Sequence, residues 1–138
     1  MGGDMMKKIA YPICKMKTGN LYLFNEQSKR GRCIFAGNRH VSELTELTDE
    51  ERSAYFQELA EVARVLHAVF KPDKLNYGAY GDTGCHFHIH LVPKYKDGDE
   101  WGGTFAMNPG KKFLSQDEYE AMAEQIREKL PYWEELKL

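Results

Sequence analysis

The sequence predicts a single α+β domain in which helices pack against an antiparallel sheet. The chain has 138 residues, which suits one domain, and it shows no internal repeat or interdomain linker. Its strand-like and helix-like segments follow one another without regular β-α-β alternation. We expect the domain to span residues 9–138. Residues 1–8 are expected to be a flexible N-terminal segment, whose Met-Gly-Gly start is compatible with an expression remnant.

The first elements of the chain are predicted to form a β-hairpin. Residues 21–24 and 33–36 are short runs of apolar or strand-favouring residues. Residues 25–31 between them are polar and end in glycine, which is typical of a hairpin loop of several residues. The two runs are therefore predicted to pair as antiparallel neighbours.

Two capping boxes mark the starts of the two predicted helices. Each box places a hydroxyl residue three positions before a glutamate, and the pairs are Thr48 with Glu51 and Ser115 with Glu118. Apolar side chains then recur at three- and four-residue steps, which is the pattern of a helix with one buried face. Proline follows both patterns, at Pro72 and Pro131. The sequence thus predicts a long first helix and a shorter second one.

Three further segments have strand-like patterns. Residues 74–80 lead into a turn-rich bend at 81–84, and residues 103–107 form one more short run. Between them, residues 86–92 show the most regular alternation of the chain. Pro93 either ends this strand or marks a sheet edge. All three segments are predicted to be strands.

Histidine occupies every second position at the start of the alternating segment. The histidines are His86, His88 and His90, and the apolar residues between and after them are Phe87, Ile89 and Leu91. Successive side chains of a strand point to opposite faces, so the apolar residues should face a core and the imidazoles the other side. Imidazole has an unperturbed pKa of about 6.5, which suits a base, an acid, a nucleophile or a metal ligand near neutral pH.

The alternation by itself leaves a metal site, a structural cluster and a catalytic site open. Alternate residues of a strand lie about 7 Å apart, so one strand can offer two histidines to a metal but hardly three. The third ligand would come from elsewhere, and the candidates are His40, Asp82 and Glu26. For nucleophilic catalysis, one ring nitrogen must keep its lone pair toward the substrate while the other donates to a fixed acceptor. Flanking imidazoles and backbone N–H groups of 81–84 would then stabilise charge on phosphate oxygens.

Residues 86–92 resemble the His-apolar-His-apolar-His-apolar-apolar motif of the histidine triad superfamily of nucleotide hydrolases and transferases. Supporting resemblances upstream, with a one-residue deletion before the first histidine, are at Asn76, Gly78, Gly81, Thr83 and the segments 31–35 and 39–41. The resemblance covers residues 20–108 and is greatest to bacterial members described as dinucleoside (diadenosine) polyphosphate hydrolase-like. It implies a five-stranded antiparallel sheet with two helices, usually paired into a homodimer.

The resemblance also implies an enzyme that acts at the α-phosphorus of a nucleotide. His88 would attack that phosphorus and form a covalent nucleotidyl-histidine, and a backbone carbonyl near His90 would hold the tautomer of His88. His86 and His90 would contact phosphate oxygens or assist the leaving group. The implied substrate is a dinucleoside polyphosphate or a nucleoside phosphoramidate. No cofactor or bound metal is required, although a divalent cation can accompany a polyphosphate.

The same resemblance proposes six further residues near the nucleotide. Asn76 and Thr83 match phosphate-binding positions, and Asn25 or Glu26 falls near the position that holds ribose hydroxyls. The remaining two, Arg32 and Asp82, depart from the family pattern. Arg32 replaces a frequent fourth histidine, so it can bind phosphate but cannot transfer a proton. Asp82 replaces a glutamine and would repel a polyphosphate unless it pairs with Arg32 or a cation.

Two other functional classes compete with this enzyme. One is a non-catalytic nucleotide-binding or scaffold protein that keeps the histidines as a ligand pocket. The other is a metal-dependent hydrolase that uses the histidine cluster.

Composition narrows the partners and the compartment. The formal net charge is −2, which predicts no attraction to nucleic acid or to anionic membranes. No apolar stretch approaches the roughly 18 residues that span a bilayer, and the start lacks the apolar segment of a signal peptide. Three scattered cysteines, Cys14, Cys33 and Cys85, predict free thiols in a reducing cytoplasm rather than a disulfide framework.

Overall fold

The computed structural model describes residues 9–83 and 86–137, which form one antiparallel sheet with two helices. The strands are β1 (Ala10–Lys15), β2 (Gly19–Phe24), β3 (Cys33–Gly37), β4 (Lys74–Gly78) and β5 (His88–Lys94). They lie in the order β1-β2-β3-β5-β4, and all neighbours are antiparallel. The predicted α+β class is confirmed. The expected flexible segment at residues 1–8 lies outside the described residues, and so do Gly84 and Cys85.

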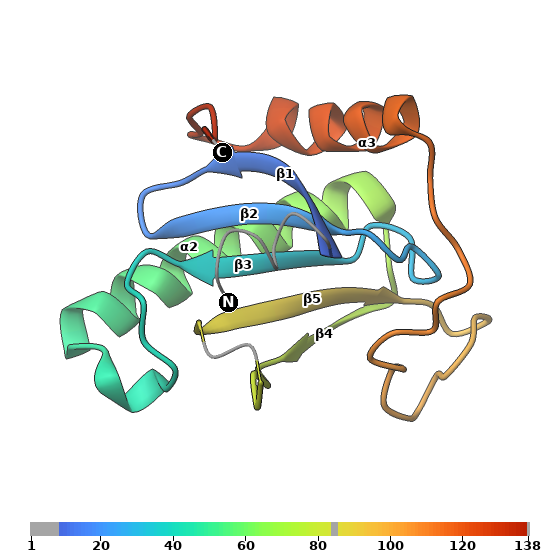
Figure 1. Cartoon of the computed structure of the whole chain (residues 1–138). Coiled ribbons are helices and arrows are strands. Elements are labelled where there is room, and N and C mark those ends of the chain that lie inside the picture. The colour runs from blue at the N-terminus through green and yellow to red at the C-terminus, as the bar shows by residue number, and fades with distance from the viewer. Residues whose placement is uncertain (1–8, 84–85, 138) are drawn as a thin grey trace.

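Both helices lie on one face of the sheet. After the short 3-10 turn η1 (Leu44–Glu46), α2 (Asp49–Phe70) runs behind the sheet and α3 (Gln116–Lys129) runs beside β1 (Figure 1). Both predicted capping boxes are present at the helix starts. The apolar stripes of both helices form the main core with the strands, through residues such as Leu59, Leu66 and Ile126. No described helix is long and apolar enough to cross a membrane.

The predicted strand at 103–107 is wrong, because this segment is a loop and the fifth strand is β1 instead. The loop is fixed by individual contacts rather than by a ladder: Glu100 accepts a hydrogen bond from the N–H of Ala106 at 2.9 Å, and Arg32 donates to the Ala106 carbonyl at 3.2 Å. β1 escapes sequence detection because its pairing register with β2 shifts between Pro12 and Cys14. Such an irregularity interrupts the alternation that marks a strand.

The histidine strand begins at His88 rather than His86 and continues through Pro93. Phe87 precedes it and donates its N–H to the carbonyl of Val41 at 2.7 Å. Pro93 pairs with Leu75 of β4, whereas the register with β3 ends at Leu91. Proline is tolerated there because no residue of β3 pairs with β5 at this position, so the missing N–H of Pro93 breaks no hydrogen bond to β3.

Glu58 of α2 joins the helix layer to the turn between β1 and β2. Its buried carboxylate accepts hydrogen bonds from the N–H groups of Lys17 and Thr18 at 3.1 and 2.7 Å and from the Thr18 hydroxyl at 2.6 Å. We expect Glu58→Ala to lower the free energy of unfolding by about 1–3 kcal/mol, because it leaves these donors without an acceptor. Urea denaturation measures this loss. Arg64→Ala, at an exposed position of the same helix, is the control and should change stability by under about 0.5 kcal/mol.

Candidate functional site

The strand register places His88 and His90 on the sheet face opposite the helices. The residues directly across on β3 are Ala36 for His88 and Ile34 for His90. Ala36 and Ile34 belong to a small apolar cluster separate from the main core, whereas Phe87, Ile89 and Leu91 are part of that core. The predicted division of the two faces is therefore confirmed for these two histidines. Their ring centroids lie 5.1 Å apart.

One hydrogen bond fixes the tautomer of His88. Its Nδ1 lies 2.7 Å from the carbonyl oxygen of His86. A carbonyl only accepts, so Nδ1 carries the proton and Nε2 of the neutral ring keeps its lone pair. Burial lowers the pKa of His88 from its usual value, which favours this neutral form. The backbone carbonyl that holds the tautomer of His88 was expected near His90. In the structure it is the carbonyl of His86, two residues before His88.

His86 uses both of its ring nitrogens within the protein. Its Nε2 donates to the carbonyl of Gly37, at the end of β3, and its Nδ1 lies 3.0 Å from Nδ1 of His40. Because Nε2 holds the proton of the neutral ring, Nδ1 of His86 accepts from His40. The pKa of His86 is lowered, chiefly by burial. The side chain of His86 therefore ties the approach to β5 onto β3 and His40, and its carbonyl orients His88.

Arg32 lies beneath His90 rather than at the surface. It is 1% exposed and its Nη2 lies 3.2 Å from Nδ1 of His90. Its guanidinium stacks between two aromatic rings, with centroid distances of 4.0 Å to Phe24 and 5.0 Å to Phe105. Cation–π contacts of this kind stabilise a buried guanidinium. The ion pair expected between Arg32 and Asp82 is absent among the described residues, and Asp82 is exposed.

Aromatic rings enclose His90. Phe24 and Tyr80 each make an edge contact with its ring, at centroid distances of 5.7 and 6.1 Å. Gly78, directly opposite His90 on β4, makes room for Tyr80, because a Cβ at Gly78 would lie 2.5 Å from the tyrosine ring. Sequence reasoning missed Phe24 and Tyr80. Phe24 could have been found from the register of the predicted hairpin, which places it on the face that also carries Ile34.

The remaining predicted residues lie in three places. Asn76 is on the histidine face of β4, two residues along the strand from Gly78. Thr83 is exposed in the loop before β5. Asn25 follows β2, and its carbonyl accepts a hydrogen bond from the Tyr119 hydroxyl at 2.6 Å. The structure thus brings His88, His90 and Arg32 together and places Asn76 on the same face.

Glu26 has a structural role, because its carboxylate anchors two loop segments by hydrogen bonds. Its carboxylate accepts hydrogen bonds from the N–H and hydroxyl of Ser28 and from the N–H groups of Lys111 and Lys112, at 2.6–2.9 Å. Burial alone would raise the pKa of Glu26, but these four donors lower it to about 2. The ionised carboxylate therefore anchors the segment that leads to α3, with its acceptor positions taken by the protein.

Comparison with known proteins agrees with this geometry. Residues 30–97, which include the hairpin's second strand, α2 and the histidine strand, match the family model described as HIT domain. The chain belongs to the histidine triad superfamily. The likeness to a solved structure extends further: a histidine triad protein from Sinorhizobium meliloti shares the fold with a TM-score of 0.86 and 21% identity, over 94% of this chain and 96% of that one.

Curated relatives of this histidine triad protein match a shorter part of it. "Protein hit" of Bacillus subtilis is 28% identical over 89 residues, 61% of this chain and 61% of that protein. An "AP-4-A phosphorylase" of Mycobacterium tuberculosis is 33% identical over 90 residues, 61% of this chain and 41% of that protein. The matched part therefore covers less than two thirds of either relative.

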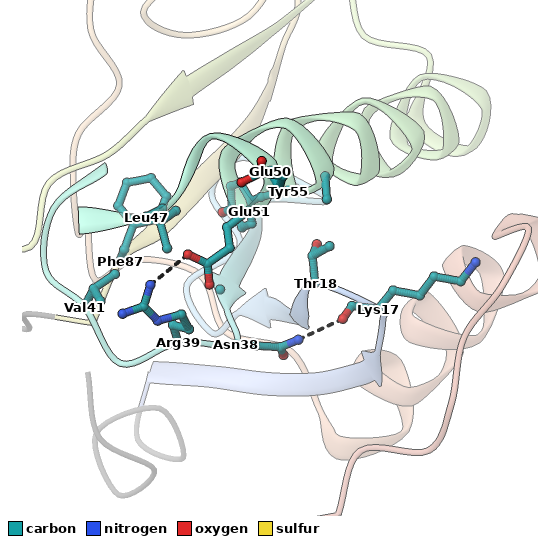
Figure 2. Close-up of a pocket in the computed structure, with 12 residues that line it drawn as sticks. Lys17, Thr18, Asn38, Arg39, Val41, Leu47, Glu50, Glu51, Tyr55 and Phe87 are labelled. Atoms are coloured by element: carbon teal, nitrogen blue, oxygen red, sulfur yellow. Dashed lines mark hydrogen bonds and ion pairs between the residues drawn. The ribbon is translucent and has the colours of Figure 1, made fainter. Parts of the chain in front are cut away.

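A cavity of the histidine triad domain lies on the helix side, at the start of α2 (Figure 2). It has a volume of about 330 Å³ and an apolar wall that includes Val41, Tyr55 and Phe87. At its rim Arg39 pairs with Glu51 at 2.7 Å, so these two charges already have partners. Among the described residues, no group of three His, Cys, Asp or Glu side chains is arranged to hold a metal ion, here or at the triad.

Proposed function

We propose that this histidine triad protein cleaves nucleoside phosphates at the α-phosphorus through a covalent nucleotidyl group on His88. The observation that carries the proposal is the hydrogen bond from Nδ1 of His88 to the His86 carbonyl. It leaves a lone pair on Nε2, which is the form that attacks phosphorus. Membership of the histidine triad superfamily supports the same chemistry. The substrate class is a dinucleoside polyphosphate or a nucleoside phosphoramidate, and the relative named AP-4-A phosphorylase supports the former.

The proposed reaction has two balanced steps. In the first, the Nε2 lone pair of His88 forms a bond to the α-phosphorus, and the bond from phosphorus to the leaving group breaks with its electron pair on that group. In the second, a water oxygen bonds to phosphorus, the P–N electron pair returns to Nε2, and the proton of the water passes to solvent. An acceptor other than water makes the protein a transferase. Nδ1 of His88 stays protonated throughout, because its acceptor is a fixed carbonyl.

Other residues of the proposed site bind rather than react. The N–H of a neutral His90 donates to phosphate oxygens, Asn76 and Thr83 bind further phosphate oxygens, and Asn25 is the candidate for the ribose. Glu26 is the weaker ribose candidate, since its oxygens hold Ser28 and the segment at 111–112. Asp82 is exposed in the loop before β5; we place it near the phosphates, where a divalent cation travelling with a polyphosphate would offset its charge. The remaining proposals are a homodimer, no resident cofactor and a reducing cytoplasm, in keeping with free thiols at Cys14 and Cys33.

Isotope labelling tests the proposed point of cleavage. Diadenosine tetraphosphate is incubated with the protein in water enriched in ¹⁸O, and the products are weighed by mass spectrometry. We expect the label on the nucleoside monophosphate, because water attacks the α-phosphorus held by His88. Label on the other fragment would contradict the proposal. Tight binding without turnover would favour the scaffold alternative, and turnover that a chelator abolishes for every substrate would favour the metal-dependent one.

A further inference from the structure

The guanidinium of Arg32 makes no close ion pair within the part of the chain that the structure describes, and the carboxylates of Glu26 and Glu100 act on it only from longer range. It donates to Nδ1 of His90 and to the Ala106 carbonyl, each at 3.2 Å, and to the sulfur of Met107 at 3.4 Å. Its Nε has no hydrogen-bond partner among the residues that the structure describes. No carboxylate of the described residues lies within ion-pair distance of it. Burial lowers the pKa of Arg32 to about 10 even with the two longer-range carboxylates nearby. A buried cation without a close counter-ion is costly, so its retention calls for a role.

The contact between Arg32 and His90 decides which nitrogen of His90 carries the proton. Arginine has only donors, so Nδ1 of His90 must accept and the proton of the neutral ring sits on Nε2. A second proton on Nδ1 would point at the guanidinium and place two positive charges side by side. Burial, Arg32 and His88 together lower the pKa of His90 to about 3. The titratable or charged groups that face the ring are Arg32 from the start of β3, His88 on β5 and Tyr80 after β4.

A neutral Nε2–H is a good hydrogen-bond donor but a poor acid, because losing that proton would produce an imidazolate. A leaving group beside His90 must therefore depart with its own negative charge. A phosphate or nucleotide released from a phosphoanhydride does so as a stable oxyanion. An amine released from a phosphoramidate needs a proton that this pair of residues does not supply at neutral pH.

We propose that Arg32 is a positioning residue that sets leaving-group specificity, by holding His90 as a neutral donor and so favouring phosphoanhydrides over phosphoramidates. The inference rests on the proposed function and narrows its substrate class. Arg32 acts through the ring of His90, while its charge also stabilises the oxyanion that leaves. A histidine at position 32 lacks the permanent charge and could itself titrate, so this role needs a permanently charged donor.

Two variants and two measurements test this role. The variants are Arg32→Lys, which keeps a charged donor, and Arg32→Gln, which removes the charge. The first measurement is ¹⁵N NMR of the histidine side chains between pH 4 and 8. We expect His90 in the unmodified protein and in Arg32→Lys to show a protonated Nε2 and no titration in this range, whereas Arg32→Gln should move its titration toward pH 6. A wild-type His90 that titrates near pH 6.5, or carries its proton on Nδ1, would overturn the proposal.

The second measurement is kcat/KM for diadenosine tetraphosphate and for adenosine 5′-phosphoramidate at pH 6. We expect the wild type to favour the phosphoanhydride, and Arg32→Gln to raise the relative rate on the phosphoramidate at least tenfold, while Arg32→Lys retains the wild-type ratio. An unchanged ratio in Arg32→Gln would overturn the specificity role. If Arg32→Gln does not fold, the wild type tests the specificity role by itself, with a series of substituted phenyl esters of AMP. We expect its kcat/KM to fall as the leaving group becomes more basic. A kcat/KM that stays constant across the series would overturn the specificity role. Absence of turnover on both substrates would overturn the proposed function, while the NMR result still decides the Arg32–His90 pairing.

Discussion

Replacing His88 with alanine or asparagine is expected to lower kcat by at least about 10³-fold, because each variant removes the nitrogen that attacks phosphorus. His88→Asn keeps a polar side chain of similar size beside Ala36 and should still bind nucleotide. Its loss should therefore appear in kcat rather than in the dissociation constant. Such a split separates a nucleophile from a residue that only binds.

Steady-state hydrolysis and equilibrium nucleotide binding, measured on the same preparations, test this expectation. His67→Ala is the matched control, because His67 is an exposed histidine of α2 on the helix side of the sheet. It should retain wild-type kcat. If His88→Asn kept more than about a tenth of the wild-type kcat, His88 would not be the nucleophile.

The folded protein is expected to lose stability in mild acid because of His90. The pKa of this ring is about 3 in the folded chain, mainly through burial and then Arg32, against about 6.5 in an unfolded one. Below pH 6.5 the unfolded chain therefore binds a proton that the folded chain does not. The free energy of unfolding falls as pH falls from 6.5 toward 3, and His90 alone contributes about 2 kcal/mol of loss between pH 7 and pH 5.

Urea denaturation at pH 7 and pH 5 measures this loss, and a variant isolates it from the carboxylates that titrate at lower pH. His90→Gln keeps an acceptor for Arg32 without the ionisable ring, so the difference between the two pH values should shrink by about 2 kcal/mol relative to wild type. His67→Gln, on the exposed face of α2, should leave the wild-type difference unchanged. An equal pH dependence in wild type and His90→Gln would show that His90 is protonated in the folded chain.

Local patterns in the sequence were enough to predict where the helices begin and which face of the strand carries His88 and His90. The capping boxes at Thr48 and Ser115 lie within four residues of the groups they satisfy, so their chemistry is visible in sequence. The alternation from Phe87 to Leu91 likewise predicts which side chains share a face of the sheet. These features were correct because they depend on neighbours in the chain.

The architecture of the site depended on long-range contacts instead. Arg32 and His90 are 58 residues apart in sequence, and nothing near Arg32 indicates that it faces a histidine rather than solvent. The alternation also suggested three equivalent imidazoles, whereas the ring of His86 turns to Gly37 and His40. Its departure follows from the start of β5 at His88, which frees the preceding residues from the strand geometry. Such differences arise when tertiary hydrogen bonds outweigh a local pattern.

Trapping the covalent intermediate decides whether His88 carries the nucleotidyl group. The protein is mixed with adenine-labelled diadenosine tetraphosphate, quenched within milliseconds in mild alkali, where phosphohistidine survives, and digested for mass spectrometry. We expect one adenylyl group on Nε2 of His88 in the wild type and none in His88→Asn. Substrate turnover in the wild type with no adduct on His88, or with the adduct on His86 or His90, would contradict it.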